Sequence, residues 1–442
     1  MPRVAILNLG CSKNQIDGER MLGLLAESGF SLASDFAKAD AIIVNTCAFI
    51  KEAKQEAIGA ILEMARFKKS GACTTLAVAG CFSERFRSEA RAHFPEVDAW
   101  LGTRDWPALL ASLLHARRTS LPGRVLFPPH ATQYLKIAEG CSRRCSFCAI
   151  PGIRGPLTSR PEREILREAR WLYSRGVREC ILVSQDTSAY GTDRCGSLVH
   201  LLELLLARTK FPWIRLMYLH PQRVNDDFLR LFAQEKRLLP YFDIPLQHIN
   251  DDLLRSMKRR PLSADIRLLI ERIRTIVPDA AIRTTFIVGY PGETSRHFCE
   301  LLDFVEETRF DHLGVFPYSP EEGTAAYSLR KRPADATANH RCEQLMTLQR
   351  RVNAARCALL VGKTIPVIVD GPADGSDPGD LFGSAQRPPP NKSALVARTR
   401  WDAPEVDGTV LLPHGGARVG AIVPALIVSA SDYDLVGTPV RR

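Results

Sequence analysis

The chain has 442 residues, of which 45% are hydrophobic and 24% are charged, so it is too long for one ordinary core and suits two or three folded domains. It has no uncharged apolar run of the roughly 20 residues needed to span a bilayer, and its start, MPRVAILNLG, lacks the pattern of a secretory signal. We therefore expect a cytoplasmic protein, and the net charge of +10 permits an acidic partner such as nucleic acid without requiring one.

Residues 1 to about 115 alternate strand-like and helical patterns, which predicts a parallel sheet covered by helices. Three strand-like segments end on a cysteine: VAILNLGC at Cys11, AIIVNTC at Cys47 and TLAVAGC at Cys81. Consecutive members are separated by one βα unit, roughly 30 residues or more. Because the carboxyl ends of parallel strands meet at one edge of a sheet, we expect the three thiols to converge there as a soft metal centre.

The number of thiols is informative, because a closed zinc or iron–sulfur site usually has four protein ligands. Three thiolates leave one metal position open to an outside ligand. The alternative is three unrelated buried cysteines, since free cysteine is commonly buried. The other cysteines share no pattern and are interpreted as incidental thiols: Cys73, Cys180, Cys195, Cys299, Cys342 and Cys357.

The middle of the chain predicts a second α/β domain. Residues 119–133 are rich in Pro and Gly and are interpreted as a linker. Six candidate strands follow, separated by helical patterns, and a helical segment covers roughly 337–361. Six βα units fit an open sheet or a partial (β/α) barrel, whose functional face lies at the carboxyl ends of its strands.

From Lys363 the pattern changes to short strands and turns, which predicts a small antiparallel β-barrel. Within it, the Pro/Gly-rich stretch 371–390 is predicted to be a mobile loop. The expected organisation is therefore 1–118 as an N-terminal domain, 119–133 as a linker, 134–362 as a central domain with a helical extension, and 363–442 as the barrel.

The segment EGCSRRCSFCAIPGIRG holds the second group of cysteines, Cys141, Cys145 and Cys148, spaced CxxxCxxC at the end of the first central strand. Three thiolates are again enough for a 4Fe–4S cluster with one vacant iron. A zinc knuckle would need a fourth Cys or His close by, and the nearest candidate, His130, lies before the strand.

This motif resembles the radical S-adenosylmethionine (SAM) superfamily. The resemblance implies that the vacant iron chelates SAM and that an electron from the cluster cleaves it to methionine and a 5′-deoxyadenosyl radical. Further SAM contacts are implied in three segments, SFC, LVSQDTSAYG and TTFIVGYPGET. The residues concerned are Phe147, Gln185, Asp186, Gly289, Gly292 and Glu293. No catalytic residue beyond the two clusters is implied.

The N-terminal cysteines, the central motif and the C-terminal barrel together look like the methylthiotransferase family. The resemblance implies that the N-terminal cysteines hold a second 4Fe–4S cluster, and that SAM serves both as methyl donor and as radical source. It also implies that the barrel is a TRAM-like domain, which docks the macromolecular substrate. NLGCSKNQID, DIPLQHIND and WDAPEVDGTVLL look like the RimO-type branch, although Ser12 stands where that branch often has proline.

The RimO-type resemblance implies methylthiolation of the β-carbon of an aspartate in small-subunit ribosomal protein S-twelve, either free or in an assembling subunit. It also implies a flavodoxin- or ferredoxin-type reductant and no membrane partner. A related branch acts on a hypermodified adenosine of tRNA near the anticodon. From Lys363 onward acidic residues slightly outnumber basic ones, which favours a protein substrate over tRNA. A non-enzymatic iron–sulfur electron carrier or zinc scaffold is the remaining alternative.

Overall fold

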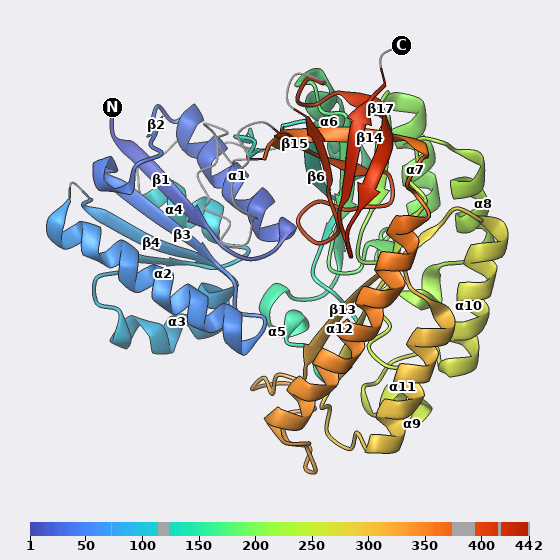
Figure 1. The fold of residues 1–442 in the computed structure, drawn as a ribbon. Coiled ribbons are helices and arrows are strands. Elements are labelled where there is room, and N and C mark those ends of the chain that lie inside the picture. Colours follow the sequence, from blue (N-terminus) through green and yellow to red (C-terminus); the bar gives the residue numbers. More distant parts are fainter. Residues whose placement is uncertain (72, 114–122, 129, 374–393, 414–416, 441–442) are drawn as a thin grey trace.

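The computed structural model describes residues 1–71, 73–113, 123–128, 130–373, 394–413 and 417–440. In Figure 1 the blue N-terminal domain lies beside a larger domain coloured green to orange, against which the red C-terminal strands pack. The start of the predicted linker and most of the predicted loop 371–390 lie outside the described residues. None of the described helices combines the length and the apolar character needed to cross a bilayer.

The N-terminal domain is a five-stranded parallel sheet in the order β2-β1-β3-β4-β5. The central strand, β3, is buried at every position, as a strand covered on both faces should be. Side chains of α2 and α3 pack on one face of the sheet, and those of α1 and α4 pack on the other. The strands are β1 (Arg3–Asn8), β2 (Ser31–Leu32), β3 (Ala41–Thr46), β4 (Thr75–Gly80) and β5 (Ala99–Leu101), and the helices are α1 (Ser12–Glu27), α2 (Lys51–Ser70), α3 (Cys81–His93) and α4 (Trp106–Leu113).

The central domain has the six predicted strands, arranged as two three-stranded parallel sheets. A bridge between Ile214 and Leu238 joins the sheets, so the strands form a partial barrel in the order β6-β9-β10-β11-β12-β13. The strands are β6 (Thr132–Lys136), β9 (Glu179–Val183), β10 (Trp213–Leu216), β11 (Tyr241–Asp243), β12 (Ala281–Val288) and β13 (His312–Pro317).

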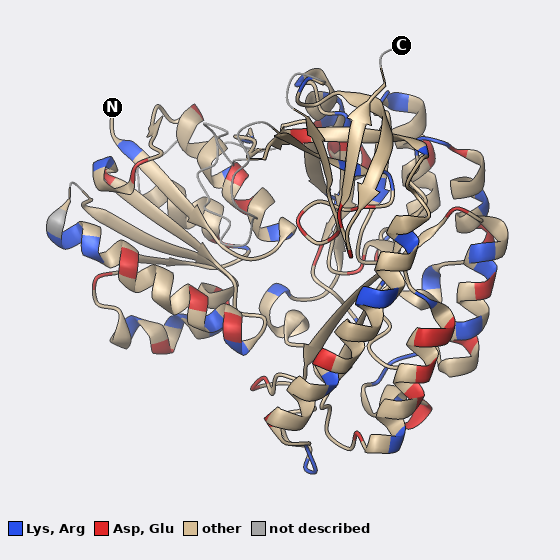
Figure 2. Ribbon diagram, in the orientation of Figure 1, with Lys and Arg blue, Asp and Glu red and all other residues tan. Residues whose placement is uncertain are grey.

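Amphipathic helices cover the outside of this partial barrel, and Figure 2 shows Lys, Arg, Asp and Glu along many of them. They are α6 (Glu162–Ser174), α7 (Leu198–Arg208), α8 (Asp226–Gln234), α9 (Asp251–Ser256), α10 (Ser263–Ile276), α11 (Ser295–Thr308) and the long α12 (Asp335–Ala358). The loop after β6 contains a two-stranded ribbon and a short helix: β7 (Ala138–Glu139), β8 (Thr158–Ser159) and α5 (Ile150–Arg154).

The C-terminal strands form a closed barrel in the order β14-β15-β16-β18-β17. The expectation of an antiparallel barrel holds for every pair except β16 and β18, which are parallel. The reason is geometric, since five strands cannot alternate in direction all the way round a closed ring. The strands are β14 (Thr364–Pro372), β15 (Ala394–Thr399), β16 (Val410–Pro413), β17 (Ile422–Ala430) and β18 (Leu435–Pro439).

The C-terminal barrel docks on the amino ends of the central strands. Arg398 in β15 lies 2.7 Å from Glu179, the first residue of β9, and Arg215 of β10 lies 2.6 Å from the same carboxylate. The Tyr241 hydroxyl, at the start of β11, donates to Asp407 at 2.6 Å. This docking covers the amino ends of the central strands, so access to the interior of the partial barrel remains at the carboxyl ends.

We predict that Arg398→Ala lowers the free energy of unfolding by about 3–5 kcal/mol, because it leaves the buried carboxylates of Glu179 and Asp370 without one of their partners. Urea denaturation of the full chain measures the change. The matched control is Arg267→Ala, which breaks an exposed pair with Glu307 and should cost less than about 1 kcal/mol. Equal losses for the two variants would contradict the prediction.

Candidate active site

The three N-terminal cysteines lie at neighbouring strand ends, as the sequence predicts. Cys11 caps the start of α1 after β1, Cys47 directly follows β3, and Cys81 opens α3 directly after β4. Because β1, β3 and β4 are adjacent in the sheet, the three thiols meet at one edge. We call them the N-terminal triad.

Two glycines allow this close approach. Gly10, just before Cys11, has a φ of +93°, and a Cβ atom there would lie 2.8 Å from the Cβ of Cys47. Gly80, just before Cys81, has a φ of +89°, and a Cβ atom there would lie 2.5 Å from the carbonyl oxygen of Thr46. A larger residue at either position would strain the backbone and push neighbouring strand ends apart.

The charges around the N-terminal triad act differently on its members. Burial raises the pKa of Cys47 to about 12, and the neighbouring thiols of Cys81 and Cys11 add to this effect. Burial also raises the pKa of Cys81, although Arg154 opposes it. Cys11 is exposed at the surface. The surrounding chain partly desolvates its thiol, but Lys13, Arg154 and the backbone N–H groups of Lys13 and Asn14 together outweigh this effect and lower its pKa.

The surroundings of the N-terminal triad favour an anionic metal cluster. Cys11 is the N-cap of α1, and Cys81 is the first residue of α3. Both thiols therefore lie at a helix amino end, which carries partial positive charge. The buried hydroxyls of Ser12 and Ser83, in the first turns of these helices, have no hydrogen-bond partner among the described residues. They are therefore available as donors to a bound group.

The cysteines of the central motif form a second group, the central triad, in the loop after β6. Burial raises the pKa of Cys148 to about 12 and raises that of Cys141, and in both cases the neighbouring thiols contribute. The Arg259 guanidinium lies 3.8 Å from the sulfur of Cys145. Arg259 belongs to the run MKRRP (257–261), three of whose basic side chains line the cavity described next.

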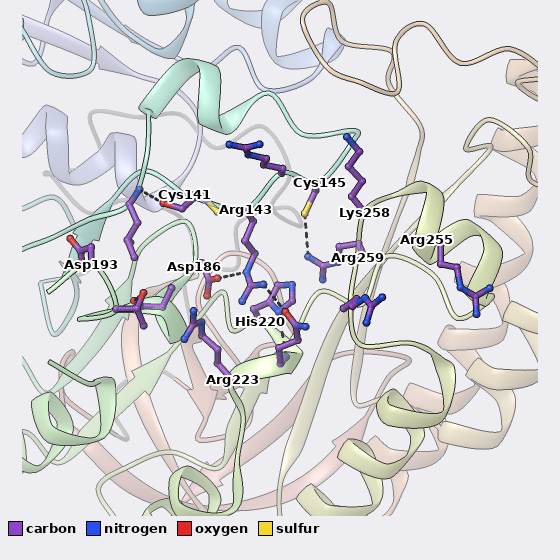
Figure 3. Close-up of a pocket in the computed structure, with 17 residues that line it drawn as sticks. Cys141, Arg143, Cys145, Asp186, Asp193, His220, Arg223, Arg255, Lys258 and Arg259 are labelled. Atoms are coloured by element: carbon purple, nitrogen blue, oxygen red, sulfur yellow. Dashed lines mark hydrogen bonds and ion pairs between the residues drawn. The ribbon is translucent and has the colours of Figure 1, made fainter. Parts of the chain in front are cut away.

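A cavity of about 750 Å³ opens beside Cys141 and Cys145, at the carboxyl ends of the central strands (Figure 3). Its lining is strongly basic, and its two carboxylates are already bound to the chain's own groups. Asp186 accepts from Arg143 at 2.6 Å, and Asp193 accepts from Ser159. The basic side chains of the lining are Arg143, Arg144, Arg223, Arg255, Lys258, Arg259 and Arg260.

The residues with implied SAM contacts are distributed unevenly around this cavity. Asp186 lines it, whereas Phe147 packs on the apolar cluster around Tyr290 and Tyr318. The amide of Gln185 turns to Glu139, to which it donates at 2.8 Å.

The loop that follows β12 holds the other three residues with implied SAM contacts. Buried Glu293 accepts from Arg341 at 2.6 Å and from the backbone N–H of Gly289, and Gly292 donates to the backbone of Lys331. Contacts of these residues with SAM remain predictions.

Neither triad has the spacing of a site for a single metal ion. No three His, Cys, Asp or Glu side chains in the described part of the chain surround one point closely enough to hold a lone metal ion. In a four-iron cluster each thiolate binds a different iron, so its ligands stand farther apart than those of one ion. All the cysteines are free thiols, so none of the six is held in a disulfide.

Known families match this chain in three consecutive segments. Residues 3–102 match the uncharacterized protein family UPF0004, residues 135–305 match the radical SAM superfamily, and residues 361–440 match the TRAM domain. The chain is 42% identical to the ribosomal protein uS12 methylthiotransferase RimO of Trichlorobacter lovleyi, covering 100% of this chain and 98% of that protein. The RimO protein of Desulforamulus reducens is 41% identical, covering 99% of each chain. The chain belongs to the RimO family.

Solved structures agree with this assignment at the level of the fold. The radical SAM methyltransferase TsrM from Kitasatospora setae, with cobalamin and a [4Fe-4S] cluster bound, has a TM-score of 0.55 at 14% identity and covers 79% of this chain. The cobalamin-dependent radical enzyme OxsB has a TM-score of 0.50 at 12% identity. The RimO-type resemblance inferred from the sequence is therefore confirmed by the relatives, and the fold by both comparisons.

A charged network joining the two domains of this RimO family member was missed by the sequence analysis. Asp17 of α1 pairs with both Lys136 and Arg154 of the central domain, and both cations also reach Glu139. Arg154 is 1% exposed. The quoted motif contains Arg154, but only the fold reveals that its side chain faces the other domain.

We predict that in metal-free, reduced protein Cys11 is alkylated by iodoacetamide much faster than Cys47. The thiolate is the reactive form, and the pKa of Cys11 is lowered whereas that of Cys47 is raised to about 12. Peptide mass spectrometry at neutral pH measures the two rates. The same comparison in urea is the control, because unfolding should bring the rates together. Equal rates in the folded protein would contradict the assigned electrostatics.

Proposed function

We propose that this protein methylthiolates the β-carbon of an aspartate in small-subunit ribosomal protein uS12, using two 4Fe–4S clusters and SAM. The observation that carries the proposal is that three thiols meet at one edge of the N-terminal sheet, while three more lie in the loop after β6, where Cys141 and Cys145 line a cavity. The end of that loop contacts Asn14, next to the first group, through Arg154. The names of the RimO relatives supply the substrate.

In this proposal Cys11, Cys47 and Cys81 ligate an auxiliary cluster. Cys141, Cys145 and Cys148 ligate the cluster that binds SAM. When bound, these groups supply radical cleavage of SAM, hydrogen abstraction from an unactivated carbon, and sulfur for insertion. The chain itself fixes the loop of the central triad on the domain that carries the N-terminal triad, through Arg154 and its partners Asn14 and Asp17.

The proposal gives the polar groups of the cavity a binding role. Asp186 lines the cavity and is proposed to bind a cationic group of SAM. Phe147, Gln185, Gly289, Gly292 and Glu293 are the further proposed contacts, although they do not line this cavity. Burial and the neighbouring cations Arg259, Arg143 and Arg223 lower the pKa of His220, so its ring is neutral at physiological pH. The electron would come from a flavodoxin- or ferredoxin-type protein in the cytoplasm.

The C-terminal barrel favours a protein substrate over tRNA. Its described strands, β14 to β18, contain only two charged residues, Asp370 and Arg398, and these pair with each other at 2.6 Å. In Figure 2 the strands β14 and β17 are almost entirely tan. Several apolar side chains on this surface are exposed, among them Leu426, Val428 and Val436. A tRNA-docking surface needs basic residues to neutralise phosphates, and the described strands offer none free for that purpose.

The direct test incubates the reduced, iron-loaded protein and SAM with either uS12 or tRNA, and measures the mass of each product. We expect uS12 to gain one methylthio group, located on an aspartate by peptide fragmentation, and tRNA to remain unchanged. Small ribosomal subunits should be included as a third substrate, because free uS12 and the assembling subunit are both candidate targets. A mass gain on tRNA alone would replace this proposal with the tRNA alternative.

We predict that Cys47→Ala abolishes methylthiolation but retains cleavage of SAM, and that iron falls from about eight to about four per chain. Cys145→Ala should abolish both activities. Cys73→Ala is the matched control, because Cys73 is a buried thiol of the same domain outside the triad and should leave the iron content unchanged. Loss of SAM cleavage in Cys47→Ala would show that the two sites do not act separately, and a preparation holding only zinc would exclude radical chemistry.

A further inference from the structure

The loop that carries the central triad also reaches into the N-terminal domain. We propose that Arg154, at the end of this loop, is a positioning residue that holds the N-terminal triad in register with the central triad and lends positive charge to the auxiliary cluster. The inference rests on the proposed function, because it requires both triads to hold clusters.

The short helix α5 fixes the backbone of this loop against the N-terminal domain. Ile153 is buried within the apolar core of that domain, next to residues of the sheet and of α3. Its carbonyl accepts from the Thr103 hydroxyl at 3.3 Å, and the carbonyl of Arg154 accepts from Arg104 at 2.6 Å. Figure 1 shows α5 between the two domains. The loop following Cys148 is therefore anchored on the domain that carries the other triad.

The side chain of Arg154 connects the loop to the N-terminal triad through Asn14. Its Nη2 donates to the Oδ1 atom of Asn14, and the sulfur of Cys81 lies 3.7 Å from that same oxygen. The Asn14 amide also donates to the backbone of Thr46, next to Cys47, at 2.8 Å. Arg154 therefore reaches two members of the N-terminal triad through one buried asparagine.

The other edge of the guanidinium is held by carboxylates. Nη1 donates to Asp17 at 3.1 Å and to Glu139 at 2.9 Å, so the planar fork of Arg154 bridges three acceptors from both domains. A lysine at this position would keep the charge but could not span these acceptors together.

The charges of Arg154 and Asp17 should act on the auxiliary cluster in opposite directions. Arg154 places a positive charge beside Asn14, whose oxygen lies 3.7 Å from the sulfur of Cys81, and Asp17 places a negative charge 3.1 Å from that guanidinium. Reduction adds one electron to a cluster, so a nearby cation favours the reduced form and a nearby anion disfavours it. This pair of residues therefore offers a test that a purely structural role would not pass.

The test measures the midpoint reduction potential of each cluster in the full-length, iron-loaded protein, by titration with a chemical reductant monitored by electron paramagnetic resonance. A background in which the central triad is replaced by alanine identifies the signal of the auxiliary cluster. We expect Arg154→Gln to shift the auxiliary potential to more negative values and Asp17→Asn to shift it to more positive values. The central cluster should shift less in both variants.

Two further variants separate charge from structure. Arg154→Lys retains the charge and should restore most of the auxiliary potential, even where the broken fork lowers thermal stability. Arg124→Gln is the matched control, because Arg124 is also a buried arginine that joins α1 to the central domain, through Glu19 and Glu168. Its loss should destabilise the protein without shifting the auxiliary potential.

Shifts in the same direction for Arg154→Gln and Asp17→Asn, or no shift in either, would overturn the inference. So would an equal shift in Arg124→Gln. If Arg154→Gln does not fold, Asp17→Asn still gives the direction of the shift in the auxiliary potential. Arg154→Lys then shows whether the potential stays close to that of the unmodified protein when the charge is kept. Failure of the proposed function would be distinct, because the unmodified protein would then bind one cluster or none, or would not modify uS12.

Discussion

The arrangement of the two triads depends on a buried network of four charges between the first two domains. Asp17 and Glu139 face Lys136 and Arg154, so two negative and two positive side chains compensate each other away from water. Such a network adds little net stability, because desolvation offsets much of the attraction between the charges. Its effect is on geometry, since any other docking of the domains would leave a buried charge without its partner.

The common direction of the central strands explains why the N-terminal domain and the C-terminal barrel dock at opposite ends of the central domain. The amino ends of the strands carry Glu179 and Tyr241, which bind Arg398 and Asp407 of the C-terminal barrel. Lys136 lies at the opposite end of β6 and binds the N-terminal domain through Asp17. The C-terminal barrel therefore closes the end where chemistry does not occur in such folds, and the N-terminal domain brings its triad to the end where it does.

The sequence was sufficient for features that depend on local pattern and spacing. Strands ending on Cys11, Cys47 and Cys81 one βα unit apart predicted their convergence, because the geometry of a parallel sheet leaves little freedom at neighbouring strand ends. The roles of Arg154 and Arg259 could not be predicted, since arginine within a loop is usually solvated and only tertiary packing turns it inward. The parallel pair β16 and β18 also required knowledge that the barrel closes with an odd number of strands.

The surroundings of the triads also explain how two of their thiols, Cys47 and Cys148, can be kept for metal rather than for other reactions. Burial raises the pKa of Cys47 and of Cys148 to about 12, so in the metal-free protein these thiols stay protonated and unreactive. Ligation requires the thiolate, so binding of a cluster must release those protons and place negative charge in a desolvated site. Arg154 near the N-terminal triad and Arg259 beside Cys145 are placed to compensate that charge. In each triad a buried thiol stays protonated until metal binds, and a neighbouring arginine compensates the charge of the bound group, so the surroundings favour an anionic cluster over an empty site.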